Sequence, residues 1–394
     1  MRKNFILGGL LMAATATFAQ DDLIKKVEGN GSENSQGYQF TTQVDLEATD
    51  VKNQGRSGTC WSYATTSFVE SEMIRMGNDP VDIAEMFTVR MVYLDKADKY
   101  VRLHGSLNFG QGGALPDVLY VIKKYGAVPQ EAYPGLNYGT DINNHGEMEG
   151  MLRGITDAVV KNKNGQITPN WKVAYNGILD SYLGEFPTEF EWEGKTYTPR
   201  SFADKVVGID ADDYIQLTSF THHPFNAWCQ IQVPDNWAWS ASYNMPLDAM
   251  MAELDNALDN GYTVSWATDV SEKGFSLKSG LAIVPAEDMK KMSAEEKMAH
   301  FQSPHDEMVV TQENRQEAYD NYQTQDDHGL QITGRAVDQN GTKYYIVKNS
   351  WGDRENGYKT GYLHVSEAFV RYKSISIMFH KDGMTKKTKK ATNM

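Results

Sequence analysis

The sequence predicts an α+β protein in which a helical region early in the chain is joined to a β-sheet region near its end. Residues 60–76 place apolar side chains at helical spacing, with no Gly or Pro to interrupt them. Residues 328–352 instead alternate in character around an Asn-Gly turn, which is the pattern of a β-hairpin. A chain of 394 residues is long enough for two domains, or for one domain with a large insertion.

The N-terminus has the layout of a secretory signal peptide. Arg2 and Lys3 precede an apolar stretch, and the small-x-small pattern at residues 17–19 suits cleavage before Gln20. The apolar stretch is too short to cross a bilayer as a stable helix. We therefore expect residues 1–19 to be removed and the mature protein to be periplasmic or extracellular, without a membrane segment. The alternative is an N-terminal helix that docks on the core.

The composition limits the partners and the stabilising chemistry. The net charge is −14, and an acidic surface argues against nucleic acid as a partner, because phosphate binding requires clustered Lys and Arg. Two cysteines are few for an exported protein, so disulfides are not expected to stabilise it. No spacing of His, Cys or carboxylates suggests a metal site, and no cofactor is expected. We interpret Cys229 as a small buried hydrophobic residue.

A Gly-rich loop leads into the helix that begins at Cys60. A cysteine in the first turn of a helix lies at the positive end of the helix dipole, which favours the thiolate and lowers the pKa of the thiol. The unpaired backbone N–H groups of this turn can stabilise an oxyanion when the thiolate attacks a carbonyl group. Gln54, in the loop, is placed to supply a second donor. Taken alone, the segment more often indicates a buried cysteine that starts an ordinary amphipathic helix.

The predicted hairpin brings a histidine and an amide close together. His328 stands at the start of the first strand and Asn349 at the end of the second, so both lie near the open end of the pair. A neutral amide there orients the imidazole and leaves a Cys–His pair free to form thiolate and imidazolium. Trp351 is expected to cover this hydrogen bond. The combination of Cys60, His328 and Asn349 favours nucleophilic catalysis over three unrelated structural residues.

These segments resemble the papain-like cysteine peptidases, in which a Gln-Gly loop precedes a Cys-Trp helix start, and His and Asn-Ser-Trp-Gly segments follow much later. The matching residues are Gln54-Gly55, Cys60-Trp61, His328 and 349–352. Ser57 stands where papain-like enzymes carry an upstream cysteine, and the spacing from Cys60 to His328 exceeds their roughly 130–150 residues by more than a hundred. Both departures point to the C1B branch, which contains the bleomycin hydrolases and the bacterial aminopeptidases C.

The resemblance implies a papain-like two-lobed fold: a left lobe of helices, a right lobe that is a β-barrel, and a substrate cleft between them. The peptidase domain is expected over residues 44–380, with a large, mainly helical insertion at about 140–240. Gly112 and Gly113 match the cleft wall along which a peptide backbone lies, since absent side chains allow close approach. An ordinary turn before a helix is the alternative for this pair. Trp61 is expected to support the site.

The same resemblance implies a peptidase that cuts peptides with Cys60 as nucleophile, His328 as base, Asn349 as its orienter and Gln54 at the oxyanion. The branch typically consists of aminopeptidases, because a C-terminal arm enters the cleft. Residues 381–394 are lysine-rich and shorter than that arm. An endopeptidase with an open cleft, and a non-catalytic peptide-binding protein of the same fold, are therefore the alternatives. Members of the branch usually form a homo-hexamer. The shorter tail leaves a different assembly as the alternative for this chain.

Two terminal segments are expected to lie outside the folded domain. Residues 20–43 form a short propeptide, an ordered strand or a flexible leader. The flexible leader is the default, because the composition around Gly29 to Gly37 is polar and contains Gly and Ser. Residues 381–394 form a basic tail that is expected to be solvated and disordered.

Overall fold

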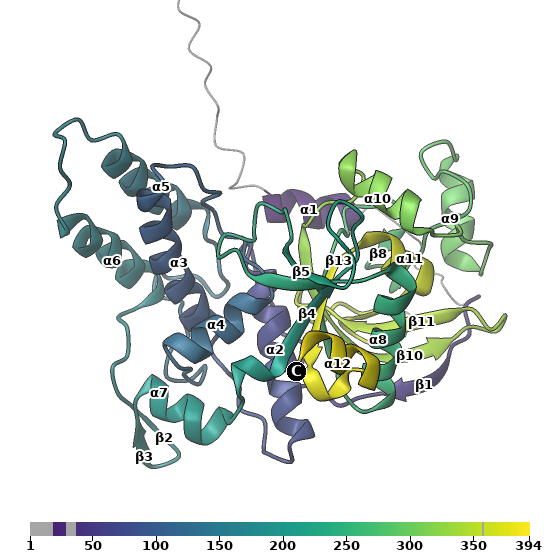
Figure 1. Ribbon diagram of the computed structural model, residues 1–394, viewed down its shortest axis with the longest axis horizontal. Helices are drawn as coiled ribbons and strands as arrows, with labels where there is room; N and C mark the ends of the chain where they lie inside the picture. Colours follow the sequence, from purple (N-terminus) through teal and green to yellow (C-terminus); the bar gives the residue numbers. More distant parts are fainter. Residues whose placement is uncertain (1–18, 29–36, 357) are drawn as a thin grey trace, which may run out of the picture.

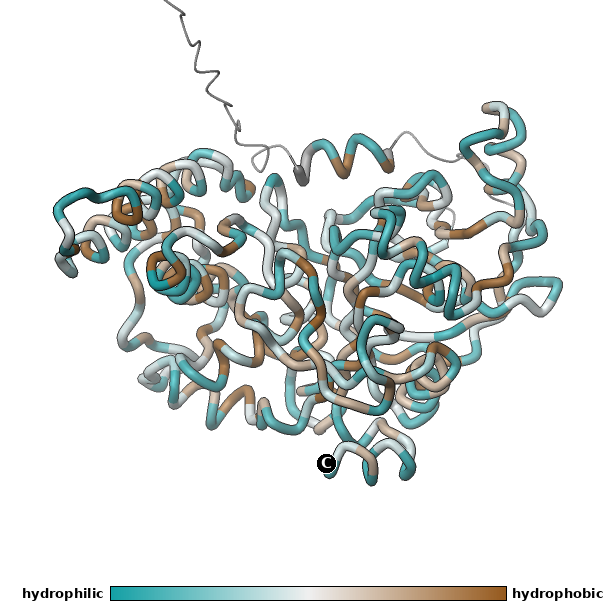
Figure 2. Tube along the Cα trace, turned by 45° about the horizontal axis from the view of Figure 1, so that its top comes forward, coloured by the Kyte–Doolittle hydropathy of each residue, from teal (hydrophilic) through white to brown (hydrophobic). Residues whose placement is uncertain are grey.

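The computed structural model describes residues 19–28, 37–356 and 358–394. All but the last residue of the predicted signal peptide lies outside this range. Figure 1 shows a helical part on the left and a sheet part on the right, the arrangement that the predicted α+β class requires. In Figure 2 the hydrophobic segments gather inside both parts, and the outer helices and loops are largely hydrophilic. Among the described residues, no helix combines the length and apolar character needed to cross a membrane.

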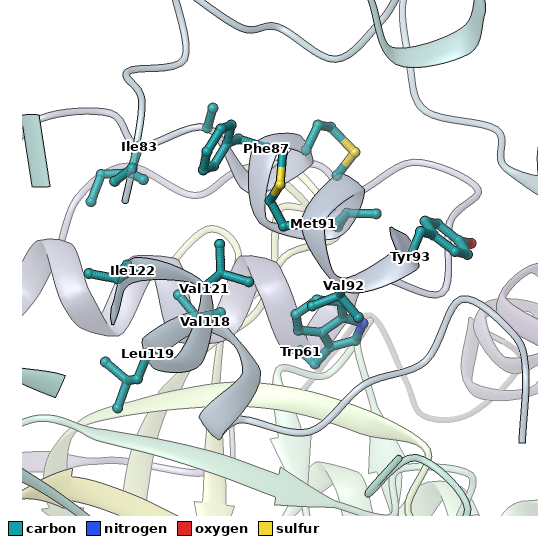
Figure 3. Close-up of a cluster of buried hydrophobic side chains, with 14 of the residues drawn as sticks. Trp61, Ile83, Phe87, Met91, Val92, Tyr93, Val118, Leu119, Val121 and Ile122 are labelled. Atoms are coloured by element: carbon teal, nitrogen blue, oxygen red, sulfur yellow. The ribbon is translucent and has the colours of Figure 1, made fainter. Parts of the chain in front are cut away.

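The helical part is built around the helix that starts at Cys60. This helix, α2, is buried along nearly its whole length because it packs against helices on one side and the sheet on the other (Figure 1). Figure 3 shows Trp61 of α2 among apolar side chains of the next two helices, including Val92 and Val118. The helices of this part are α2 (Cys60–Arg75), α3 (Glu85–Arg102), α4 (Pro116–Lys124), α5 (Gly146–Val160), α6 (Asn170–Leu183) and α7 (Pro199–Phe202).

The sheet part contains one sheet of 11 strands, in the order β5-β6-β4-β13-β7-β10-β11-β12-β9-β8, with β1 added beside β10. The two outermost strands of this path do not pair with each other within the described residues. The right lobe is therefore an open sheet there, where the sequence predicted a closed barrel. The strands are β1 (Thr41–Asp45), β4 (Tyr214–Thr218), β5 (Ala227–Gln230), β6 (Ala241–Asn244), β7 (Val264–Thr268), β8 (Phe275–Ser276), β9 (Leu281–Ala282), β10 (His328–Val337), β11 (Lys343–Lys348), β12 (Tyr362–Ser366) and β13 (Ser374–His380).

The predicted hairpin is β10 with β11, paired antiparallel up to Val337 opposite Lys343. Its turn spans residues 338–342 and is longer than a two-residue Asn-Gly turn. Asp338 Oδ1 accepts hydrogen bonds from the backbone N–H groups of Asn340 and Thr342, both at 2.9 Å. The Asp side chain therefore organises the turn, as short polar side chains often do.

The insertion is helical only in its first half. After α5 and α6 the chain forms the small antiparallel pair β2 (Phe190–Trp192) and β3 (Lys195–Tyr197), then α7, the π-helical turn η1 (Ala203–Val207) and the turn η2 (Ala211–Asp213). The remainder supplies β4, β5 and β6, and β4 pairs with β13 in the large sheet. The prediction of a mainly helical insertion is therefore wrong for its second half, which forms short strands between brief helical turns.

Both terminal segments pack on the protein. Residues 19–28 form α1 (Ala19–Glu28), whose Leu23 and Val27 are buried against the core of the sheet part. At the other end, η3 (Lys381–Gly383) leads to α12 (Lys386–Thr392), which is anchored by buried Glu253. Glu253 accepts hydrogen bonds from Thr385 N at 2.8 Å and Thr388 Oγ1 at 2.5 Å. The expected disordered tail is thus a helix whose positive end meets a carboxylate.

The other helices cover the sheet part. They are α8 (Leu247–Asp259), which carries Glu253, and α9 (Ala294–Gln302), α10 (Gln312–Asp320) and α11 (Glu367–Lys373).

Candidate active site

A cavity of about 800 Å³ lies between the helical and sheet parts. From the helical part it is lined by the start of α2 and by the loop of residues 108–115. From the sheet part it is lined by the first residues of β10 and by residues of β7 and β13. The structure therefore brings four of the predicted site residues to one cavity, together with Trp61. The four are Cys60, Gly112, Gly113 and His328.

Cys60 is the first residue of α2, and its side chain is 9% exposed. The start of β10 approaches this helix end because residue 329 is a glycine. A Cβ atom at Gly329 would lie 3.2 Å from both N and Cα of Trp61, and 3.3 Å from the carbonyl carbon of Cys60. Since nearly all real Cβ contacts are longer, only glycine allows this approach without displacement of the backbone.

The pKa of the Cys60 thiol is raised to about 12, in the direction opposite to the prediction from the helix alone. Burial is the main cause, and the charges of Asp326, Asp235 and Asp327 add to it. A hydrogen bond from the backbone of Gly329 acts the other way. The helix terminus and the Asp326–Asp327 pair were visible in the sequence, but the burial of Cys60 and the approach of distant Asp235 were not. A thiolate without a neighbouring positive charge is therefore disfavoured. It becomes favourable when a base beside it takes the thiol proton and becomes positively charged.

Asn349 orients His328. Its Oδ1 lies 2.8 Å from His328 Nε2 and also accepts the backbone N–H of Ser350 at 2.8 Å. Because that backbone group is a donor, the amide atom between them is the oxygen, and Nε2 must carry the hydrogen. His328 Nδ1 is buried and has no hydrogen-bond partner within the described residues. The atom that remains free to accept a proton is therefore Nδ1.

Burial also sets the charge of the histidine. It lowers the pKa of His328 to about 4, although the hydrogen bond that Nε2–H donates to Asn349 Oδ1 opposes this shift. The ring of Trp351 lies 4.3 Å from the imidazole, centroid to centroid, with the planes inclined by 32°. Trp351 is itself 3% exposed, so it keeps water from that face. At neutral pH the free site thus holds an uncharged imidazole that can accept a proton.

Gln54 is fully buried and does not line the cavity. Its Nε2 donates to the carbonyl of Ser57 at 2.8 Å, and its Oε1 accepts from Ser350 Oγ at 2.7 Å. A primary amide has two N–H hydrogens, so one donor of Gln54 is not used by the Ser57 contact. Its role at the oxyanion stays a prediction. The contacts also tie the loop before Cys60 to the segment that carries Asn349.

Two residues that the sequence analysis missed hold the glycine loop. Gln111 Oε1 accepts the N–H of Gly58 at 2.7 Å, and the Gln111 carbonyl accepts Trp61 Nε1 at 3.0 Å. Lys96 is a buried residue of α3, and its ammonium donates to the carbonyl of Gly110, at 3.0 Å, and to that of Gly112. Nothing in the sequence distinguishes Lys96 from the neighbouring surface lysines of its helix, because the acceptors are loop carbonyls.

The sequence analysis also missed the acidic residues of the cavity. Asp326 and Asp327 directly precede His328, and Asp235 comes from the inserted segment; all three line the cavity. The adjacent pair was visible in the sequence, but Asp235 is distant along the chain. Among the described residues, Glu70, Asp82 and Glu85 form a cluster of three carboxylates outside this cavity. The Lys52 ammonium forms an ion pair with each of them. A lysine thus already supplies the cation there.

The fold and the cleft define the class of protein, a papain-like cysteine peptidase. Residues 177–394, more than half of the chain, match the Peptidase C1-like family, and the chain belongs to this family. The chain is 24% identical to aminopeptidase E of Lactobacillus helveticus over 89% of this chain and 84% of that protein. It is 21% identical to aminopeptidase C of Streptococcus thermophilus over 92% and 87%. The resemblance stated from the motifs is confirmed.

A solved structure supports the same fold. The crystal structure of PepW from Lactobacillus rhamnosis HN001 superposes with a TM-score of 0.69 at 17% identity, and the match covers 95% of this chain and 91% of PepW. At this identity the likeness establishes the architecture alone. It includes the inserted region, since almost the whole of both chains is matched.

Proposed function

We propose that this protein is an exported cysteine aminopeptidase, which removes N-terminal residues from peptides with Cys60 as nucleophile. One observation carries the proposal. His328 is held through Nε2 by Asn349, and its Nδ1 is left without a partner in the cavity that Cys60 also lines. A base that is oriented on one side and free on the side of a thiol is the arrangement that activates a nucleophile.

The electrostatics favour a neutral resting pair. Because the pKa of Cys60 is raised and that of His328 is lowered, the thiol keeps its proton until a substrate carbonyl is in position. His328 Nδ1 then takes the thiol proton as sulfur bonds to the carbonyl carbon. The imidazolium that forms lies beside the new thiolate, so the charged pair is favoured where a lone thiolate is not.

Acyl transfer is completed in two steps. The tetrahedral oxyanion is stabilised by the backbone N–H of Cys60 and by the free N–H of Gln54. His328 Nδ1–H protonates the leaving amine, the C–N bond breaks and a thioester remains on Cys60. Nδ1 next removes a proton from water, which attacks the thioester. The acid product leaves, and the proton returns to sulfur.

The names of the relatives support the aminopeptidase reading, since the proteins matched over most of their length are named aminopeptidases E and C. One observation favours an endopeptidase as the second candidate. The C-terminal helix α12 packs on α8, and no residue of 381–394 lines the cavity. The tail therefore does not close the cleft, and any exclusion of longer chains must come from other residues.

Paired substrates test this proposal. Leucyl-aminomethylcoumarin and its N-acetylated form are incubated with the purified protein and with Cys60→Ala under reducing conditions. We expect release of the fluorophore from the free-amine substrate only, and none with the variant. Cleavage of acetylated peptides at a similar rate supports the endopeptidase. No cleavage across several side chains favours a non-catalytic peptide-binding protein, and full activity in Cys60→Ala contradicts the mechanism.

A further inference from the structure

We propose that Asp326 and Asp235 form a subsite that binds the positively charged α-amino group of the peptide substrate, and so make the enzyme an aminopeptidase. This inference rests on the proposed function and adds the residues that select the substrate's amino terminus. The group bound is the substrate's protonated α-amino group, which lies against the cleft wall beside Cys60.

The two carboxylates come from distant segments and meet at the nucleophile. Asp326 precedes the catalytic strand β10, whereas Asp235 lies in the inserted region, before β6. Both line the cavity that contains Cys60, and their charges add to the rise in the pKa of the Cys60 thiol that burial causes. Asp235 also raises the pKa of Asp326. The three groups therefore face one cavity.

Asp235 forms part of the wall along which the substrate backbone is expected to lie. A Cβ atom at Gly112 would meet Asp235 Oδ2 at 2.0 Å, so the carboxylate rests directly on this glycine. Asn108 Nδ2 donates to the other oxygen, Oδ1, at 3.0 Å and fixes the side chain. The absence of a side chain at Gly112 therefore admits the Asp235 carboxylate to the wall, beside the predicted substrate path.

Asp326 differs from the acidic residues around it because its carboxylate has no hydrogen bond or ion pair with the described residues. Asp327 Oδ1 accepts the backbone N–H of Val270 at 2.8 Å. Asp269 accepts Ser271 N and Gln325 N, both at 2.9 Å. These two carboxylates support the local backbone.

A cation beside Asp326 would stabilise its ionised carboxylate. Burial raises the pKa of its carboxyl to about 8, and the like charges of Asp235 and Asp269 contribute. Burial raises the pKa of Asp235 and the buried Lys96 ammonium opposes this rise, but the hydrogen bonds of Lys96 go to the loop carbonyls of Gly110 and Gly112. A desolvated carboxylate that faces a like charge is stabilised when a cation enters. A substrate ammonium supplies that charge at the place where the scissile bond must be held.

A basic side chain on the amino side of the cut would offer the same chemistry, so the test separates the two sources. Leucyl-aminomethylcoumarin is compared with 4-methylpentanoyl-aminomethylcoumarin, which lacks only the amino group. Acetyl-lysyl-leucyl-aminomethylcoumarin is compared with its norleucyl analogue. Each substrate is measured with the wild type, Asp326→Asn, Asp235→Asn and Glu147→Gln. The last variant removes an exposed negative charge from the same cavity and controls for long-range effects.

We expect kcat/KM of both Asp variants on the leucyl substrate to fall roughly 10- to 100-fold, mainly through KM, since hydrogen bonds to charged groups have this range of strength. The preference of the wild type for leucyl over 4-methylpentanoyl should collapse in the variants. Glu147→Gln should stay within about twofold of the wild type. Alkylation of Cys60 by iodoacetamide should persist in both Asp variants, which shows that the site is folded.

Other outcomes overturn the inference. A loss confined to the lysyl-leucyl substrate assigns the subsite to a basic side chain, and unchanged KM for the leucyl substrate removes Asp326 and Asp235 from recognition. Equal losses on charged and uncharged substrates indicate a structural effect instead. Failure of the proposed function is distinct, because the wild type itself would then cleave none of the substrates.

Discussion

Replacement of Gly329 by alanine probes how closely the catalytic strand must approach the catalytic helix. The new methyl group would lie 3.2 Å from N and Cα of Trp61 and 3.3 Å from the carbonyl carbon of Cys60. These atoms belong to the backbone of the first turn of α2 and cannot rotate away. The strand that begins with His328 must therefore move by a few tenths of an ångström, which changes the position of the imidazole relative to the thiol.

The consequence should be larger for catalysis than for folding. Overpacking of this kind costs about 1–3 kcal/mol of stability. A displacement of about 1 Å at reacting groups costs on the order of 100-fold in rate, so we expect kcat to fall by roughly 10-fold or more while the protein stays folded. The assay is hydrolysis of the leucyl substrate, with the melting temperature measured in parallel.

Gly150→Ala is the matched control. Gly150 lies inside α5, and a Cβ atom there would meet nothing within 4 Å. Alanine should raise stability by about 0.5–1 kcal/mol, because it is the better helix former, and should leave kcat unchanged. Wild-type kcat in a folded Gly329→Ala variant would refute the conclusion that contact between β10 and α2 sets the catalytic geometry.

Three further predictions concern Asn349, Asp326 and the N-terminal segment. Asn349→Ala removes the acceptor of His328 Nε2 and should lower kcat roughly 10- to 100-fold with little change in KM; a kcat near that of the wild type would contradict the orienting role. Asp326→Asn should raise the melting temperature at alkaline pH, since the pKa of this carboxyl is raised to about 8 from 3.8. The folded state retains the proton longer than the unfolded state, so wild-type stability is lost as pH rises between about 4 and 8, and the advantage of the variant should grow over that interval and vanish near pH 4. Secretion with cleavage before Gln20 should give a mature N-terminus that begins with Gln-Asp-Asp; an intact Met1 on the exported protein would contradict the predicted processing.

The part of the site that could be predicted consists of residues whose chemistry depends on local sequence. Cys60 follows a Gly-rich loop at a helix start, and His328 and Asn349 stand at corresponding ends of one hairpin. Hydrophobic periodicity and turn chemistry are enough to place each of them. The convergence of Cys60 and His328 on one cavity rested on the family resemblance, because no local pattern encodes the docking of β10 on α2.

The remainder depends on contacts between distant segments. Asp235 reaches the cleft through an insertion whose second half was predicted to be mainly helical but supplies strands β4 and β5 to the main sheet. Lys96 can be buried because loop carbonyls accept its hydrogen bonds, and the sequence of its own helix gives no sign of these acceptors. The tail appeared solvated because it is rich in lysine, but the threonines of α12 bind Glu253 of α8. In each case the deciding partner lies far away in the sequence, where propensity and charge runs carry no information about it.

The central claim, that Cys60 is the nucleophile, is tested most directly by covalent labelling with the epoxide inhibitor E-64. Cys229 is the internal control, because it is a free thiol that is partly exposed and lies outside the cavity lining. We predict that one inhibitor molecule binds per chain, that mass spectrometry locates it on Cys60, and that peptidase activity is lost in proportion to labelling. Selective modification of Cys229, or full activity after Cys60 is completely modified, would contradict the account.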